Sequence, residues 1–151
     1  MLNVVLIEPE IPPNTGNIGR LCLAAEARLH LVGELGFSLD DRALKRAGLD
    51  YWPQVDLLRW ESFEELKEAA DGQAAFYFLT TKSDKPYWGA RFLTNDYIVF
   101  GAETRGLPKS LLDKFESTAL TIPQKSGRSL NLATSVGIVL YEAVRQLSSI
   151  G

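Results

Sequence analysis

The sequence has little cysteine or histidine: its 151 residues contain one of each, Cys22 and His30. One cysteine cannot form a disulfide within the chain, and neither residue has partners for a cluster of zinc ligands. The apolar neighbours of Cys22 favour a buried structural thiol. His30 lies between Leu29 and Leu31 in an expected strand, where packing explains it better than catalysis. We therefore expect no metal site, and hydrolase chemistry based on serine or cysteine lacks a histidine partner.

Long apolar segments are also missing from the sequence. The early apolar run 4–7 ends at Glu8 and is too short for a signal-peptide core or a membrane span. We therefore expect a cytoplasmic protein. The motifs of the common nucleotide-binding folds are absent too, because no G-x-G-x-x-G follows a strand and no G-x-x-x-x-G-K-[ST] loop occurs.

An excess of basic residues is a third absence. The chain has 16 lysines and arginines against 19 acidic residues, which gives a formal net charge of -3. The net charge therefore gives no sign of a nucleic-acid partner, although a basic patch can exist on an acidic protein. The basic residues that would form such a patch fall in the second half of the chain: Lys82, Lys85, Arg91, Arg105, Lys109, Lys125 and Arg128.

The overall composition is that of a soluble globular domain. Hydrophobic residues make up 46% of the chain and charged residues 23%. A chain of this length fits one domain with one core, and we find no linker, repeat or low-complexity tract that would divide it. We expect a single domain over residues 1–151.

Short apolar runs alternate with helical patterns along most of the chain. Ser62 and Glu65 form a capping-box pattern, and Pro108 suits the first turn of a helix. Such alternation predicts an α/β fold with a mostly parallel sheet and helices on both faces. The expected strands are Val4–Ile7, Leu29–Val32, Val55–Leu58, Ala75–Thr80, Tyr97–Phe100 and Leu120–Ile122. The expected helices are Asn14–Ala27, Asp40–Ala47, Ser62–Ala70, Pro108–Phe115 and Asn131–Leu147.

The last expected helix gives information about assembly. It is apolar on every face over residues 136–141, whereas a surface helix carries one apolar stripe. One side of this helix can pack on the sheet. A partner chain in a two-fold homodimer is the simplest cover for the other side. The alternative is a helix that is buried entirely within its own domain.

Three polar segments with glycine follow or flank expected strands, where open α/β sheets place their ligands. The first segment runs from Pro9 to Arg20. Asn14 or Thr15 can cap the helix that follows, and the amides at its N-terminus can hold an anion such as an RNA phosphate. The planar guanidinium of Arg20 also suits phosphate. Capping alone explains Asn14 but not the other polar residues.

The second segment runs from Phe100 to Pro108 and holds Glu103 between two glycines. Gly101 and Gly106 permit a positive φ and a close approach of the backbone to a ligand. A plain connection between a strand and a helix would need fewer residues and no carboxylate. We therefore interpret this segment as part of a ligand site.

The third segment runs from Ile122 to Leu132 and is a polar loop that contains Gly127. It enters the last helix through Ser129 or Asn131, and either residue can be the N-cap. Because a helix has one N-cap, capping explains only one of the two residues.

Together the three segments resemble the motifs of the SPOUT superfamily of RNA methyltransferases, in particular the small enzymes that 2′-O-methylate the wobble nucleotide of leucine tRNAs. The resemblance runs nearly from end to end of the chain. Its most specific parts are Pro9–Arg20, Arg46–Tyr51, Phe100–Pro108 and Ser129–Leu132, with Tyr141–Ala143 beyond them.

The resemblance implies a deep trefoil knot in the carboxyl-terminal third of the chain, an exception to the rule that chains do not thread loops. It also implies S-adenosylmethionine as the cofactor, bound in a bent pose within the knot and held mostly by backbone groups. The positions that match the family's cofactor site are Leu79 with the loop after it, Gly101, Gly106, Ile122, Ser129 and Leu130.

The resemblance also supplies the catalytic candidates, which are Asn14, Arg20, Glu103, Ser129 and Asn131. In the family the arginine is usually assigned to the 2′-hydroxyl. The methyl group of the cofactor sits on a cationic sulfur, so the protein needs only to position and activate the oxygen, and no metal is required. A guanidinium stays protonated in proteins, and we therefore expect Arg20 to orient the ribose or its phosphate.

The partners implied by the resemblance are tRNA, at its anticodon stem-loop, and a second copy of the chain that shares the site. We expect no additional RNA-binding domain, so the dimer surface must hold the tRNA. Lys82, Lys85 and Arg128 are the candidates for phosphate contact. Two alternatives remain: 2′-O-methylation at another position of tRNA or ribosomal RNA, and a cofactor-binding or RNA-binding module without catalysis.

Overall fold

The structure is a computed structural model that describes residues 1–148, with all of their side chains except those of residues 47–50. The strands are β1 (Asn3–Ile7), β2 (Arg28–Val32), β3 (Leu57–Trp60), β4 (Phe76–Leu79), β5 (Tyr97–Phe100) and β6 (Ala119–Leu120). The α-helices are α1 (Pro12–Ala24), α2 (Arg42–Gly48), α3 (Phe63–Ala69), α4 (Lys109–Lys114) and α5 (Leu132–Ser148). Short 3-10 helices are η1 (Leu49–Gln54), η2 (Tyr87–Gly89) and η3 (Glu116–Thr118).

Within residues 1–148 the strands form one sheet in the order β3-β2-β1-β5-β4-β6, and every pair of neighbours is parallel. β1 pairs with both β2 and β5, and all of its residues are buried. A strand that is covered on both faces is apolar throughout, which explains the continuous apolar runs in the sequence. The expectation of a mostly parallel sheet is confirmed.

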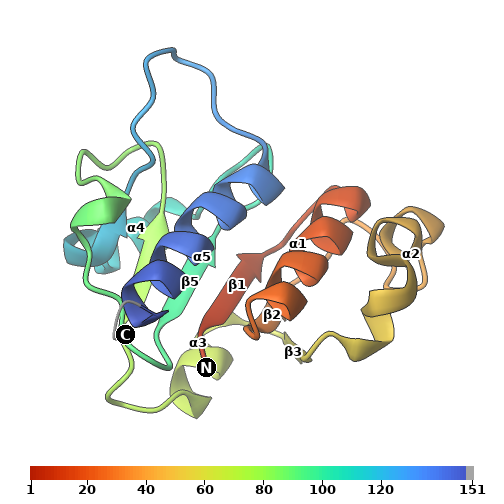
Figure 1. The fold of residues 1–151 in the computed structure, drawn as a ribbon. Helices are drawn as coiled ribbons and strands as arrows, with labels where there is room; N and C mark the ends of the chain where they lie inside the picture. Colours follow the sequence, from red (N-terminus) through yellow and green to blue (C-terminus); the bar gives the residue numbers. More distant parts are fainter. Residues whose placement is uncertain (149–151) are drawn as a thin grey trace.

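Helices cover both faces of this sheet, as expected. α1 and α5 lie side by side on one face (Figure 1), where they pack on Val4 and Leu6 of β1. α3 and α4 pack on the other face, together with Val5 and Ile7. Successive side chains of a strand point to opposite faces of the sheet, so the side chains of β1 enter two hydrophobic clusters in turn, one on each face. α2 lies against α1, outside this layer.

The two edge strands begin and end at other residues than the sequence analysis expects. β3 covers Leu57–Trp60 instead of 55–58, and β6 covers Ala119–Leu120 instead of 120–122. Each of them pairs with one neighbour only, β2 or β4. The extent of an edge strand is therefore set by the register with that neighbour, which the apolar run of the strand itself does not reveal.

The helix ends confirm one expected cap and correct two. The hydroxyl of Ser62 accepts a hydrogen bond from the amide of Glu65 at 3.1 Å, as the capping-box pattern predicts. Pro108 precedes α4 instead of forming its first turn. α1 begins at Pro12, before the expected start, because prolines suit the first positions of a helix, where a missing N–H costs nothing. The prediction that Asn14 or Thr15 caps α1 is therefore wrong, and both residues are buried within its first turns.

α5 is covered on one side only by the described part of the chain. Val136, Val139, Leu140 and Ala143 are fully buried against the sheet and α1. The side chain of Tyr141, in contrast, is 43% exposed. The alternative of a helix buried entirely in its own domain is therefore wrong. No helix within residues 1–148 has the length and apolar character needed to span a membrane.

The connection from β4 to β5, residues 80–96, runs over the same face as α5. In α5, Gln146 accepts a hydrogen bond from the amide of Phe92 at 2.8 Å and donates one to the carbonyl of Ala90 at 2.9 Å. Just after β6, Thr121 exchanges backbone hydrogen bonds with Lys85 at 2.8 Å and Tyr87 at 2.9 Å. Both the last strand and the last helix are thus hydrogen-bonded to this connection.

His30 and Cys22 have the packing roles that the sequence predicts. His30 is 2% exposed, and its Nδ1 accepts a hydrogen bond from Trp60 at 3.0 Å. This assigns the ring proton to Nε2, which lies 2.9 Å from Oδ1 of Asn3. Burial, with the positive charge of Arg28 nearby, lowers the pKa of His30 to about 4. Cys22 is fully buried, and burial raises the pKa of its thiol to about 12.

Candidate active site

A cavity of about 450 Å³ opens at the carboxyl edge of the sheet. Its wall includes Leu79 and Phe100, the last residues of β4 and β5, and Thr121, which follows β6. The three polar segments singled out in the sequence meet here. Parallel sheets bind their ligands at this position, because the loops that follow the strands converge there.

Every predicted site residue except Arg20 lines this cavity. The most distant pair, Asn14 and Asn131, is 117 positions apart in the chain. The fold thus brings together segments that the sequence could only suggest as neighbours. The lining residues among the predicted cofactor and catalytic positions are Asn14, Leu79, Gly101, Glu103, Gly106, Ile122, Ser129, Leu130 and Asn131.

The loop after β5 is folded too tightly to accept a side chain at Gly101. Gly106 has a φ of 67°, and its amide donates to the carbonyl of Ala102 at 2.9 Å. A Cβ atom on Gly101 would overlap the backbone of Gly106 and Leu107. The backbone conformation of the loop therefore requires glycine at both positions. The close approach at Gly101 is to residues 106 and 107 of the same loop.

Glu103 uses both of its carboxylate oxygens on the N-terminus of α1. Oε1 accepts a hydrogen bond from the amide of Glu10 at 2.7 Å, and Oε2 accepts one from the amide of Ile11 at 2.8 Å. The carboxylate thereby supplies the cap that α1 lacks, because its N-cap residue Ile11 has no capping side chain. The prediction that these amides hold an RNA phosphate is wrong, since the protein's own carboxylate occupies them.

Glu10 makes the reciprocal interaction. Its Oε1 accepts hydrogen bonds from both the amide and the hydroxyl of Thr104, each at 2.8 Å. These hydrogen bonds lower the pKa of Glu10 below its ordinary value. The segment before α1 and the loop after β5 are therefore joined by an exchange of carboxylates, from Glu103 to residues 10–11 and from Glu10 to Thr104.

Two asparagines continue this network to α5. Nδ2 of Asn14 donates to Oε2 of Glu103 at 3.2 Å, and Oδ1 of Asn14 accepts from Nδ2 of Asn131 at 3.1 Å. Oδ1 of Asn131 caps α5 by accepting the amide of Thr134 at 3.2 Å. Asn131 is therefore the N-cap that the sequence left open between two residues. Ser129 is exposed, and its hydroxyl is left at the mouth of the cavity.

Comparison with known proteins identifies the family. Residues 1–141 match the model of the SpoU rRNA Methylase family. The chain belongs to this family. It is 46% identical to the tRNA (cytidine(34)-2′-O)-methyltransferase of Escherichia coli (strain K12), over 97% of this chain and 94% of the relative.

Solved structures agree with this assignment. One structure, from work on the 2-OH methylation of C/U34 on tRNA, superposes with a TM-score of 0.94 at 46% identity, covering 99% of this chain and 97% of that one. The SpoU methyltransferase AviRb from Streptomyces viridochromogenes, in complex with the cofactor AdoMet, gives a TM-score of 0.86 at 26% identity. The match covers 99% of this chain and 61% of AviRb.

Arg20, the catalytic arginine implied by the resemblance, does not line the cavity of its own chain. Its guanidinium carbon lies 4.8 Å from the ring centre of Tyr51, which is a cation–π distance. Arg20 lines a second groove of about 460 Å³ between α1 and α5, together with Leu21, Ala133 and Gly137. Within one chain, the structure therefore does not bring Arg20 together with the other predicted catalytic residues.

The segment 46–51, which the resemblance singled out, lies against α1 beside Arg20. A Cβ atom on Gly19 would come within 2.7 Å of the indole of Trp52, so only glycine admits this close packing. Trp52 and Tyr51 thus contact neighbouring residues of α1, Gly19 and Arg20. The side chains of residues 47–50 in this motif lie outside the described part.

The structure also places the predicted RNA-contact residues. Lys82 lines the cavity, whereas the ammonium of Lys85 donates to the carbonyl of Ser117 at 3.3 Å and lines a neighbouring groove. Arg128 lies on the exposed loop before α5. Arg105, at the cavity wall, forms a 4.0 Å ion pair with Glu8. Two cations, Lys82 and Arg105, therefore line the cavity although the chain as a whole is acidic.

Sequence reasoning missed the carboxylate exchange and the part that Glu10 and Thr104 play in it. The available signal was an acidic residue in each of two segments that were both assigned to one site. Among the described residues, no group of three or more histidine, cysteine, aspartate or glutamate side chains could hold a metal ion. The polar groups of the wall are backbone groups, amides, hydroxyls, one fixed carboxylate and the cations Lys82 and Arg105, which suit the binding and orientation of a small molecule with mixed polarity.

Proposed function

We propose that this chain transfers a methyl group from S-adenosylmethionine to the 2′-hydroxyl of nucleotide 34, a cytidine or uridine, in tRNA, with leucine tRNAs as the substrates. One observation carries the proposal: the three motif segments line a single cavity in a chain of the SpoU family. The name of the Escherichia coli relative supports the choice of nucleotide. A tRNA substrate would locate this activity in the cytoplasm.

The cavity fits S-adenosylmethionine in size and in chemistry. Its volume of about 450 Å³ lies in the range of small-molecule sites. Leu79, Ile122 and Leu130 would hold the apolar parts of the cofactor, and the backbone at Gly101 and Gly106 would hold the polar parts. When bound, the cofactor supplies a methyl group on a cationic sulfur.

The protein's own residues divide into positioning and contact groups. Glu103 is a positioning residue, because both of its oxygens bind the N-terminus of α1. Asn14 and Asn131 hold that helix end beside α5. The exposed hydroxyl of Ser129 remains free to contact the ribose at the mouth of the cavity. In this assignment the protein acts mainly by orienting the 2′-hydroxyl towards the methyl group.

The proposal includes a two-fold homodimer in which Arg20 completes the site of the partner. Arg20 lies outside the cavity of its own chain, in the groove between α1 and α5. Small residues in that groove, Ala24, Ala133 and Gly137, leave room for a second chain to approach. The exposed ring of Tyr141 offers apolar surface on the same helix. In a two-fold dimer the contribution of each arginine would be reciprocal.

Mixed dimers test this arrangement. We expect Arg20→Ala and Gly101→Ala chains to be inactive alone, the second because alanine at position 101 overlaps the loop backbone. In a mixed dimer, the intact cavity of the Arg20→Ala chain meets the Arg20 of the other chain. Random mixing should therefore restore about one quarter of the wild-type rate, since half of the dimers carry one working site. No recovery would show that Arg20 does not act across the dimer.

Leu130→Asp provides a second cavity variant in case Gly101→Ala fails to fold. Leu130 lines the cavity from an exposed loop and is 39% exposed, so a charge there disturbs the cavity without disturbing the core. We expect its mixture with Arg20→Ala to recover activity in the same way.

The carboxyl-terminal knot is also part of the proposal. Two sets of hydrogen bonds support it: Thr121 pairs with residues 85 and 87, and Gln146 binds residues 90 and 92. The β4–β5 connection therefore touches the chain both where it leaves β6 and near the end of α5. A chain that passes beneath this connection between those two points would form the threaded arrangement that the resemblance implies.

The direct test of the function is methyl transfer from labelled S-adenosylmethionine to tRNA isolated from cells that lack the homologous gene. We expect transfer by the wild type and by Gly72→Ala, whose added methyl group meets open space, but not by Gly101→Ala. Mapping of the product should locate the 2′-O-methyl group at nucleotide 34. Methylation at another position, or of ribosomal RNA only, would replace the proposed substrate, and no transfer at all would contradict the proposed activity.

A further inference from the structure

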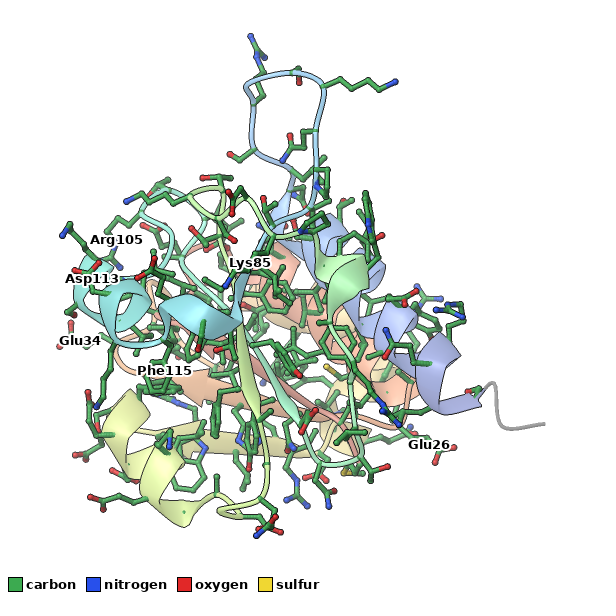
Figure 2. All side chains as sticks on the ribbon, turned by 90° about the vertical axis from the view of Figure 1, so that its left-hand side faces the viewer. Glu26, Glu34, Lys85, Arg105, Asp113 and Phe115 are labelled. Carbon is green, nitrogen blue, oxygen red and sulfur yellow. The ribbon has the colours of Figure 1, made fainter. Side chains whose placement is uncertain are left out.

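The loop from β6 to α5, residues 122–130, is the least supported part of the cavity wall. It rises away from the sheet just before α5 (Figure 1), and the side chains at its tip point into solvent (Figure 2). In the described part of the chain, none of the hydrogen bonds or ion pairs involves residues 122–130. Segments with so few hydrogen bonds change position at a low cost in free energy.

The loop is fixed at both ends, however. At one end, the backbone of Thr121 binds Lys85 and Tyr87, and at the other end Asn131 binds Asn14 and caps α5. Movement is therefore confined to the residues between these points. A segment held in this way can move towards the cavity or away from it while the fold stays intact.

The base and the tip of the loop carry different chemistry. Ile122, Gln124, Ser129 and Leu130, near its base, line the cavity. Leu130 is 39% exposed, so a movement of the loop towards a bound cofactor would bury apolar surface. The tip, residues 125–128, does not line the cavity, and a Cβ atom added at Gly127 would meet open space.

The tip also carries two positive charges that form no ion pair within the described residues. These are Lys125 and Arg128. Of the other cations near the cavity, Lys109 lies 3.1 Å from Asp113 and Arg105 lies 4.0 Å from Glu8, whereas Lys82 on the cavity wall also forms no ion pair within the described residues. Lys125 and Arg128 lie three positions apart on a loop whose base lines the cavity, so their two positive charges suit an anionic partner that covers the cavity. Phosphates of an RNA backbone match this chemistry, and the guanidinium is suited to them.

We propose that loop 122–130 couples RNA binding to cofactor binding: Lys125 and Arg128 bind phosphates of the substrate RNA, and this holds Ile122 and Leu130 against the bound cofactor. The inference rests on the proposed function, because it takes the cavity as the cofactor site and RNA as the substrate. Coupling of this kind is reciprocal, so each ligand tightens the binding of the other by the same factor. The methyl donor is then held firmly only when its acceptor is present.

The test measures the affinity of the full-length protein for S-adenosylhomocysteine by calorimetry, with and without saturating leucine tRNA from cells that lack the homologous gene. For the wild type we expect the RNA to tighten this binding by at least about fivefold, the lower end of typical couplings. In the double variant Lys125→Gln/Arg128→Gln, the affinity without RNA should be unchanged and the tightening should be lost. The slope of log affinity for tRNA against log salt concentration should also become shallower, by roughly 0.7 to 0.9 for each phosphate contact removed.

The matched control is Arg59→Gln/Lys114→Gln, which removes the same charge from exposed positions on β3 and α4, outside the cavity wall. We expect it to keep the coupling of the wild type. Coupling that persists in the tip variant, or that is lost equally in the control, would overturn the inference while leaving the proposed function intact. A wild type that binds no S-adenosylhomocysteine with or without RNA would instead contradict the proposed function itself.

Discussion

Replacement of Glu103 by glutamine keeps the shape of the side chain but exchanges one acceptor oxygen for a donor. The carboxylate accepts three hydrogen bonds, from the amide of Glu10 at 2.7 Å, the amide of Ile11 at 2.8 Å and Nδ2 of Asn14 at 3.2 Å. All three partners are donors. The NH₂ group of glutamine would therefore face at least one N–H donor, and the hydrogen bond at that donor would be lost.

The expected loss of stability follows from these contacts. A hydrogen bond to a charged group contributes about 1.5 to 3 kcal/mol, and a negative charge at a helix N-terminus contributes about 0.3 to 1 kcal/mol. Water reaches this partly exposed site and replaces part of what is lost. We therefore expect Glu103→Gln to lower the free energy of unfolding by about 2 kcal/mol, which corresponds to a decrease in Tm of roughly 4 to 8 °C for a chain of this size.

Urea unfolding followed by circular dichroism, at one fixed protein concentration, measures this difference. The control is Glu68→Gln, which removes an exposed carboxylate on α3 and should change stability by less than about 0.5 kcal/mol. Glu103→Gln, but not Glu68→Gln, should also lower kcat, because Asn14 loses its carboxylate partner. If Glu103→Gln and Glu68→Gln unfold at the same urea concentration, the carboxylate does not hold the N-terminus of α1, and the positioning role of Glu103 is refuted.

Two further predictions concern stability. Because burial lowers the pKa of His30 to about 4, while the unfolded chain keeps its ordinary value of 6.5, the unfolded state binds the proton first. The free energy of unfolding should therefore fall by roughly 3 kcal/mol as the pH drops from 6.5 to 4, and His30→Gln should flatten this dependence between pH 6.5 and 4.5 in urea titrations. Asn131→Ala removes the cap of α5 and the contact with Asn14, so we expect a loss of about 1 to 2 kcal/mol by the same assay, whereas Ser129→Ala should change stability by less than about 0.5 kcal/mol.

Periodicity predicted the elements of the fold well and their ends less well. The apolar runs at β1, β2 and β5 are buried on both faces, so almost every residue in them carries the signal. The edge strands β3 and β6 are limited by a neighbour that is distant in sequence, and no local pattern contains that information. The start of α1 differs for another reason: the expected helix begins at Asn14, whereas Pro12 and Pro13 form its first positions, where proline is favoured.

The site could be predicted as a set of residues but not as a set of contacts. Glycine and polar residues after strands identified the segments, and the fold brings them together at the carboxyl edge. Which groups pair depends on geometry across about 90 positions, such as Glu10 with Thr104, 94 positions away. The sequence suggested a carboxylate and a free helix N-terminus as two separate features of a site. In the structure they satisfy each other, and for this reason the predicted phosphate position on α1 was wrong.

α1 connects the two sites of the proposed dimer. Its N-terminus carries the network of Glu103 and Asn14 beside its own cavity, and Arg20 lies six residues further on, roughly 9 Å along the helix axis. Ile18 and Cys22 of α1 are fully buried, and because the hydrogen bonds of a helix join its successive turns, we expect a shift at the start of α1 to displace Arg20 as well.

Glu103 should therefore support its own cavity and, in the proposed dimer, the position of the Arg20 that would enter the partner's site. In mixed dimers with Arg20→Ala, the Gly101→Ala chain still supplies a well-placed Arg20, whereas the Glu103→Gln chain supplies a displaced one. We expect the Glu103→Gln mixture to recover less activity per mixed dimer than the Gly101→Ala mixture, after correction for the residual rate of each variant alone. Equal recovery would show that the position of Arg20 does not depend on the carboxylate at the start of its helix.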